Sequence, residues 1–146
     1  ATVFRQTVLT RFEQLAYGAR AQGRLSATQI GELWLKANAP YYGENVGMTA
    51  GYEYGWSYIP HFINSPFYCY AYAFGDLLVK ALYGMYRREG DAFIPKYKAL
   101  LSSGGSQTPR EQTRAIGVDI NSEAFWQIGF DELERLIAEA EKLAAQ

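Results

Sequence analysis

Histidine and cysteine are scarce in this chain of 146 residues, which contains one of each, His61 and Cys69. A single cysteine cannot form an internal disulfide, which suits a reducing compartment, so we expect a cytoplasmic location. Zinc sites need several His, Cys, Asp or Glu ligands at workable spacing, and the sequence has no HExxH or CxxC pattern. A dedicated transition-metal site built by this chain alone is therefore not expected.

Charge of one sign and long apolar runs are also lacking. The formal net charge of −1 gives no electrostatic reason to expect nucleic acid or an anionic membrane as a partner. No apolar run approaches the roughly 20 residues of a membrane-spanning helix, so no such helix is expected. The first residues show no basic stretch followed by an apolar core, so no signal peptide is expected. An independent cysteine or serine hydrolase is disfavoured, because His61 would be its sole histidine and Cys69 is expected to be buried.

Aromatic residues are abundant, with 12 Tyr, 8 Phe and 3 Trp making up 16% of the chain. Tyrosine combines a large apolar body with a polar tip and suits surfaces that contact peptides, although aromatic cores are common too. Between residues 41 and 57, aromatic residues alternate with Gly43, Gly47, Gly51 and Gly55. This mixture predicts an ordered loop rather than a linker.

Apolar spacing and capping residues predict an all-α fold, organised as a single helical domain over residues 1–146. Ser26 and Thr108 are expected N-caps, and Pro40 is expected to end the second helix. The helix that begins near Pro66 is apolar on two sides, so we expect it to be the buried central helix. The predicted helices cover residues 2–22, 27–37, 66–89, 91–103, 109–116 and 122–144.

The best candidate for chemistry is His61, which stands just before a helix whose first turns are rich in tyrosine. A neutral histidine and a tyrosine hydroxyl can both donate hydrogen bonds to the oxyanion that develops when water attacks a peptide carbonyl. A hydrogen-bonded structural histidine beside core tyrosines would account for the same residues. The residues alone leave both interpretations open.

Several short segments occur in an order and spacing that extend over nearly the whole chain, from about Phe4 to Leu143. The main ones are Ile-Pro-His-Phe at 59–62, Pro-Phe-Tyr-Cys-Tyr-Ala-Tyr-Ala-Phe-Gly at 66–75, Gly-Gly-Ser at 104–106, and Gly-Val-Asp-Ile at 117–120 followed by Phe125-Trp126. Together they resemble the C-terminal part of oligoendopeptidase F. The wider group comprises the thimet oligopeptidase-like zinc metallopeptidases.

The resemblance implies a mostly helical enzyme that hydrolyses short peptides. Its zinc would be held by two histidines of an HExxH helix and a downstream glutamate, with the motif glutamate as general base. These residues lie N-terminal to the part matched here. This chain would therefore be a C-terminal fragment of the catalytic region, inactive alone, whose partners are peptide substrates and the remaining N-terminal part of the peptidase.

The resemblance also implies roles for accessory residues. His61 matches the histidine that helps bind substrate and stabilise the transition state. Tyr70 best matches the tyrosine whose hydroxyl points at the scissile carbonyl, and Tyr68 is the neighbouring candidate. The region from Gly51 to Tyr58 would line the cleft.

The alternative is a free-standing helical module whose aromatic loop binds a peptide or protein and which has no catalytic activity. An HExxH motif encoded upstream of Ala1 would favour the peptidase, and a start near Ala1 would favour the module. The peptidases that this chain resembles enclose a deep channel. If this chain forms one wall of such a channel, the absence of the opposite wall should expose aromatic surface, chiefly in the first helix and in residues 41–58, and self-association could follow.

Overall fold

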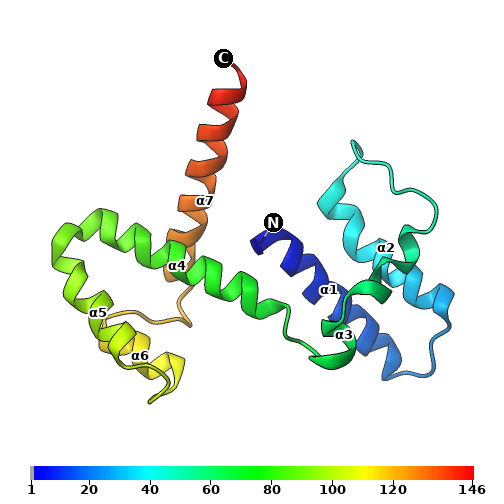
Figure 1. Ribbon diagram of the computed structural model, residues 1–146, viewed down its shortest axis with the longest axis horizontal. Coiled ribbons are helices and arrows are strands. Elements are labelled where there is room, and N and C mark those ends of the chain that lie inside the picture. Colours follow the sequence, from blue (N-terminus) through cyan, green and yellow to red (C-terminus); the bar gives the residue numbers. More distant parts are fainter. Residues whose placement is uncertain (1) are drawn as a thin grey trace. The chain divides into compact units, whose positions relative to one another are not determined.

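The computed structural model describes residues 2–146, which form seven α-helices and two short 3-10 helices (Figure 1). No strand occurs within this range, so the all-α prediction is confirmed. The chain divides into two compact units, the first ending at Phe74 and the second beginning at Gly75, and the single domain stays a prediction. The elements are α1 (Thr2–Arg20), α2 (Ala27–Tyr42), η1 (Tyr52–Tyr58), α3 (His61–Asn64), α4 (Tyr70–Glu89), η2 (Gly90–Phe93), α5 (Ile94–Ser102), α6 (Pro109–Ala115) and α7 (Glu123–Ala144).

Two predicted helix starts are confirmed by their capping geometry. The Ser26 hydroxyl accepts a hydrogen bond from the Gln29 N–H, and the Gln29 side chain accepts one from the Ser26 N–H. Thr108 and Glu111 form the same reciprocal pair at the start of α6. Such capping boxes satisfy backbone donors that the first helical turn leaves unpaired.

The predicted end of the second helix at Ala37 is wrong, because α2 continues through Pro40 to Tyr42. Proline removes only its own N–H, and the residues after it keep theirs. The helix ends at Gly43, which has a φ of 63° and donates its N–H to the Ala39 carbonyl at 3.0 Å. This left-handed φ suits glycine and completes the last turn.

The fourth helix also differs from its prediction, since α4 begins at Tyr70 and not at Pro66. Phe67 has a φ of 59°, which a right-handed helix does not allow. The helix is not buried on two sides either. Its buried side includes Ala81 and Leu82, whereas Val79, Tyr83 and Tyr86 are exposed. The predicted helix over 91–103 is resolved into η2 and α5.

In the first unit, the core lies around Trp34, which is fully buried. The Trp34 and Phe12 rings are nearly perpendicular, with a centroid distance of 5.2 Å. Gly55 packs so closely on the indole that a Cβ there would lie 2.9 Å from Trp34 Nε1. Other buried members of this core are Val8, Leu9, Ala37 and Cys69.

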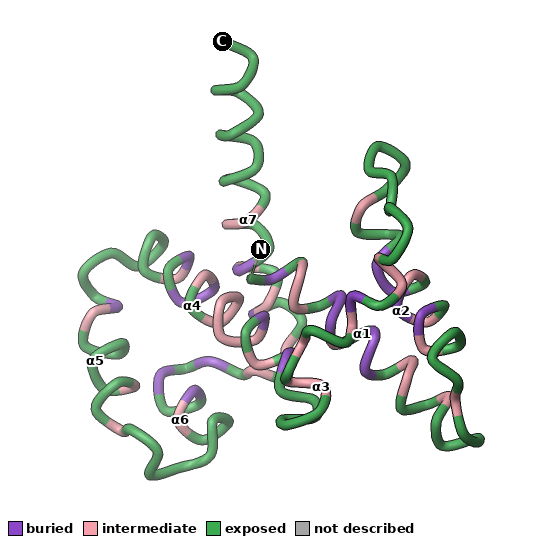
Figure 2. Tube along the Cα trace, turned by 45° about the vertical axis from the view of Figure 1, so that its right-hand side comes forward, coloured by how far each residue is buried: buried purple, intermediate pink, exposed green. Residues whose placement is uncertain are grey.

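In the second unit, α4 and α7 approach closely at Gly129, where a Cβ would lie 2.8 Å from the Leu77 carbonyl oxygen. Arg87 of α4 and Glu132 of α7 form an ion pair at 2.9 Å. The second half of α7 is exposed (Figure 2). None of the helices within residues 2–146 combines the length and apolar character needed to cross a membrane. The core contains Ala81, Leu82, Phe93, Ile116, Val118 and Phe125.

Candidate functional site

His61 lies at the start of α3 and forms a cluster with two tyrosine rings. It stacks on Tyr68 with a centroid distance of 5.6 Å and an interplanar angle of 6°. Tyr72, in the first turn of α4, meets His61 edge-on at 5.9 Å, and its hydroxyl lies 3.2 Å from His61 Nε2. The Tyr68 and Tyr72 rings are 5.4 Å apart and nearly perpendicular. We call His61, Tyr68 and Tyr72 the histidine–tyrosine cluster.

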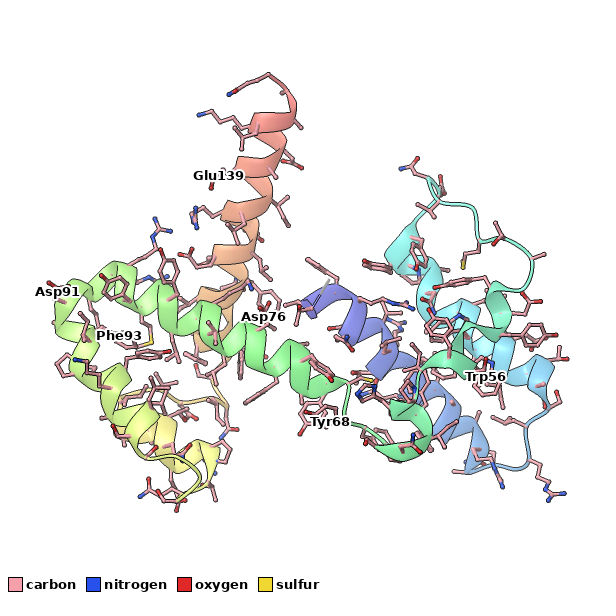
Figure 3. All side chains as sticks on the ribbon, viewed as in Figure 1. Trp56, Tyr68, Asp76, Asp91, Phe93 and Glu139 are labelled. Atoms are coloured by element: carbon pink, nitrogen blue, oxygen red, sulfur yellow. The ribbon has the colours of Figure 1, made fainter. Side chains whose placement is uncertain are left out.

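The two tyrosines predicted from the resemblance are placed differently. Tyr68 lies in the segment before α4 (Figure 3). Its ring belongs to the cluster. Tyr70 lies two residues before Tyr72, and two residues correspond to a rotation of about 200° around a helix. The Tyr70 side chain therefore points away from Tyr72, and this residue is 56% exposed. Its hydroxyl is available to a molecule that approaches from solvent.

The turn between α3 and α4 is held by helix α1. Glu13 Oε1 accepts a hydrogen bond of 2.7 Å from the backbone N–H of Phe67. One helical turn further along, the Tyr17 hydroxyl donates to the Phe62 carbonyl at 3.1 Å, and the Tyr17 ring lies 4.8 Å from the Phe67 ring. Positions i and i+4 share one face of a helix, so this face of α1 fixes both sides of the turn.

Glu13 is a charged residue in an apolar environment, with only 1% of its surface exposed. Burial raises the pKa of its carboxyl group, because removal from water disfavours the ionised form. The hydrogen bond from Phe67 and the charge of His61 lower this pKa and only partly offset the effect of burial.

Cys69 is fully buried in the core beside the cluster. Burial raises the pKa of its thiol, and the nearby Glu13 carboxyl raises it further. A protonated, inaccessible thiol is a poor nucleophile, in agreement with the sequence-based interpretation. Within residues 2–146, no three or more His, Cys, Asp or Glu side chains are grouped so that they could hold a metal ion.

The glycine-rich and aromatic loop after α2 is ordered by a hydrogen-bonded group beneath it. The Tyr52 hydroxyl donates to Asn38 Oδ1 at 3.0 Å, and Asn38 donates through Nδ2 to the Trp34 carbonyl at 2.8 Å. Burial, together with a hydrogen bond to Tyr42, raises the pKa of Tyr52 to about 12. The predicted exposure of this segment is confirmed for the large apolar residues Tyr41, Val46, Met48, Tyr54 and Tyr58.

A comparison with protein families shows to which family the chain belongs. The model of peptidase family M3 matches residues 1–132. The chain belongs to this family. Among its relatives, the protein named oligopeptidase PepF of Bacillus subtilis is 32% identical over 145 residues, which cover 97% of this chain and 21% of that protein. The protein named oligoendopeptidase F, plasmid, of Lactococcus lactis subsp. cremoris is 32% identical over 143 residues, which cover 97% of this chain and 24% of that protein.

The family match and these relatives confirm the resemblance to oligoendopeptidase F that the sequence segments indicated. The chain spans less than a quarter of the length of the two relatives, so it corresponds to a fragment of them. No solved structure matches the chain.

Sequence reasoning missed two residues of the candidate site. Tyr72 is not among the residues predicted for the site, although its spacing of four from Tyr68 is compatible with a shared helix face. Glu13 gave no signal, because its partner, the Phe67 N–H, lies 54 residues further along the chain. Because the donor is a backbone N–H, the amino-acid type of the partner residue does not reveal the contact.

Proposed function

We propose that the full-length protein is a zinc-dependent oligoendopeptidase that hydrolyses short peptides. In this proposal the chain supplies His61 and Tyr70 as hydrogen-bond donors to the oxyanion that forms at the scissile carbonyl. Membership of peptidase family M3 supports the reaction class. The observation that carries the residue roles is the histidine–tyrosine cluster, in which a half-buried imidazole is held by a stacked ring and a hydroxyl.

The cluster prepares His61 for this role. When Nε2 accepts a hydrogen bond from the Tyr72 hydroxyl, the neutral imidazole carries its proton on Nδ1 and can donate it to substrate. The stacked Tyr68 ring restricts the orientation of the imidazole. Donors that are oriented before the reaction stabilise developing charge most effectively, because they need no reorganisation in the transition state. Tyr70 is exposed at the start of α4 and can add a second donor.

The metal of the proposed enzyme would be held outside this chain. Peptidases of family M3 are zinc-dependent, whereas the residues described here do not fit a zinc site. A zinc ion bound by the remaining part of the protein would polarise the carbonyl and activate water. We therefore propose that the chain alone hydrolyses nothing and that its partners are short peptides and the rest of the peptidase. A cytoplasmic location and self-association of the chain stay predictions.

The test uses the full-length protein with the variants His61→Gln and Tyr70→Phe. Loss of one oxyanion donor is worth about 3 kcal/mol, so we expect kcat to fall about a hundredfold in each variant, with a much smaller change in KM. Zinc content and melting temperature should stay near the wild-type values. The matched control is Tyr86→Phe, which removes a hydroxyl from the same helix, α4, and should keep the wild-type kcat.

Two results would contradict the proposed roles. If Tyr70→Phe retains zinc and full kcat, Tyr70 is not the donor, and Tyr68→Phe becomes the next variant to measure. If His61→Gln lowers the melting temperature while kcat per folded molecule is unchanged, His61 is a structural residue.

A further inference from the structure

Glu13 is a buried charged residue for which the proposed reaction has no direct use. Its Oε1 atom accepts the hydrogen bond from Phe67, while Oε2 is buried without a hydrogen-bond partner. Burial of a carboxyl group with one unpaired oxygen is unfavourable by some kilocalories per mole in general, so an apolar residue would stabilise this core better. The position of Glu13 therefore calls for a reason other than stability.

The reason lies in the conformation of Phe67. A φ of 59° places this non-glycine residue in the left-handed region, which is strained for an L-amino acid with a side chain. Strained residues persist only where the surrounding structure holds them, and they concentrate at functional sites. Here α1 holds Phe67 through the Glu13 carboxyl group and the Tyr17 ring.

The strained residue determines where the cluster lies. Phe67 directly precedes Tyr68, whose ring stacks on His61. A change in φ at Phe67 rotates all of the chain that follows, so it would move Tyr68 and Tyr72 away from the imidazole. Among residues 2–146, the structure contains no hydrogen bond between Glu13 and the His61 imidazole. Glu13 affects the position of the cluster through its hydrogen bond with the Phe67 N–H.

We propose that Glu13 is a positioning residue, which holds the Phe67 turn through the backbone N–H and thereby fixes Tyr68 and Tyr72 against His61. This inference rests on the proposed role of His61 in hydrolysis. It also distinguishes two ways in which a carboxylate could act. A positioning residue needs its length and its acceptor oxygen, whereas an electrostatic partner of His61 needs its negative charge.

Two conservative variants of the full-length protein separate these roles. Glu13→Gln keeps the length and the acceptor oxygen but removes the charge, so kcat should stay within about threefold of wild type. Glu13→Asp keeps the charge but shortens the side chain by one methylene, so the oxygen no longer reaches Phe67. Displacement of a reacting group by about 1 Å can lower a rate on the order of a hundredfold, so we expect Glu13→Asp to lower kcat between about tenfold and a hundredfold, with a smaller change in KM.

A second-site change tests the mechanism directly. Glycine adopts left-handed φ values without strain, so Phe67→Gly should relieve the need for the carboxyl group. The Glu13→Asp, Phe67→Gly double variant should therefore recover at least about threefold in kcat over Glu13→Asp. Simple destabilisation of the core predicts no recovery, because Phe67→Gly also removes the ring that packs on Tyr17.

The NMR signals of the His61 ring give a readout that does not depend on activity. They are assigned by their loss in His61→Gln, and ring-current shifts from the stacked Tyr68 should change in Glu13→Asp but not in Glu13→Gln. The proposal is overturned if Gln lowers kcat as much as Asp, or if Asp leaves both kcat and the His61 signals unchanged. If His61→Gln keeps full kcat, the proposed role of His61 fails, and the His61 signals alone then decide whether Glu13 positions the ring.

Discussion

Removal of the Tyr72 hydroxyl tests how much the histidine–tyrosine cluster contributes. Tyr72→Phe deletes a single oxygen, which lies 3.2 Å from His61 Nε2. The phenyl ring stays in contact with the imidazole and with Tyr68, at centroid distances of 5.9 and 5.4 Å in the wild type. No cavity forms, because the deleted atom is at the solvent-exposed tip of a side chain that is 38% exposed.

The structure predicts a small effect on stability and a moderate effect on rate. A typical hydrogen bond contributes about 0.5–1.5 kcal/mol, and a partly exposed one belongs at the lower end because water can replace the lost partner. The free energy of unfolding should therefore fall by less than about 1 kcal/mol. In the proposed mechanism the hydroxyl acts on substrate only through His61. If the less well oriented imidazole stabilises the transition state by about 1 kcal/mol less, kcat should decrease about fivefold.

Steady-state kinetics of the full-length protein on a fluorogenic peptide would measure this effect, with zinc content and melting temperature determined on the same samples. Tyr86→Phe is the matched control, since Tyr86 lies on the same helix and is also 38% exposed. An unchanged kcat in Tyr72→Phe would refute the orienting role of the hydroxyl. A decrease on the order of a hundredfold at wild-type stability would instead indicate that Tyr72 itself donates to the carbonyl.

Two further predictions concern stability in the first unit. Because burial raises the pKa of Glu13 above the ordinary glutamate value, the folded state binds this proton more tightly than the unfolded state. The stability contributed by the protonated form is thus fully present below the pKa of Glu13 in the unfolded state, and it is lost as pH rises through the pKa in the folded state. Urea unfolding at a series of pH values should show this loss in the wild type but not in Glu13→Gln. Gly55→Ala would place a Cβ 2.9 Å from Trp34 Nε1 and should lower the free energy of unfolding by about 1–3 kcal/mol. Gly47 has open space around it, so Gly47→Ala should leave the free energy of unfolding unchanged. Equal unfolding midpoints for the two variants would contradict this packing.

Local signals in the sequence predicted the helices well where the residues that decide a boundary are neighbours. Ser26 with Gln29 and Thr108 with Glu111 cap their helices through contacts over three residues, and the spacing is visible in the sequence. The prediction that α2 ends before Pro40 was wrong, because a proline marks a helix end only at some positions. Here Pro40 lies within the last turn of the helix. Short-range rules therefore give the existence of an element more reliably than its end.

The candidate site was predictable only in part, because its parts meet through long-range contacts. His61 and Tyr68 were identified from residue chemistry and from the resemblance. The hydrogen bonds that hold their turn join α1 to residues that lie 45 and 54 positions later. Each of these bonds ends on a backbone atom of Phe62 or Phe67, so no complementary side chain marks it in the sequence.

The error at the start of α4 is the most informative about function. In a continuous helix, Tyr68 and Tyr72 would lie about 10 and 16 Å along the axis from His61, because each residue rises 1.5 Å. The observed ring distances are 5.6 and 5.9 Å. The chain must therefore leave the helical conformation between His61 and Tyr70. It does so first at Ser65, where α3 ends, and again at Phe67, which has a φ of 59°. A regular helix over this segment would be easier to predict and less strained, but it could not bring the histidine and the tyrosines together.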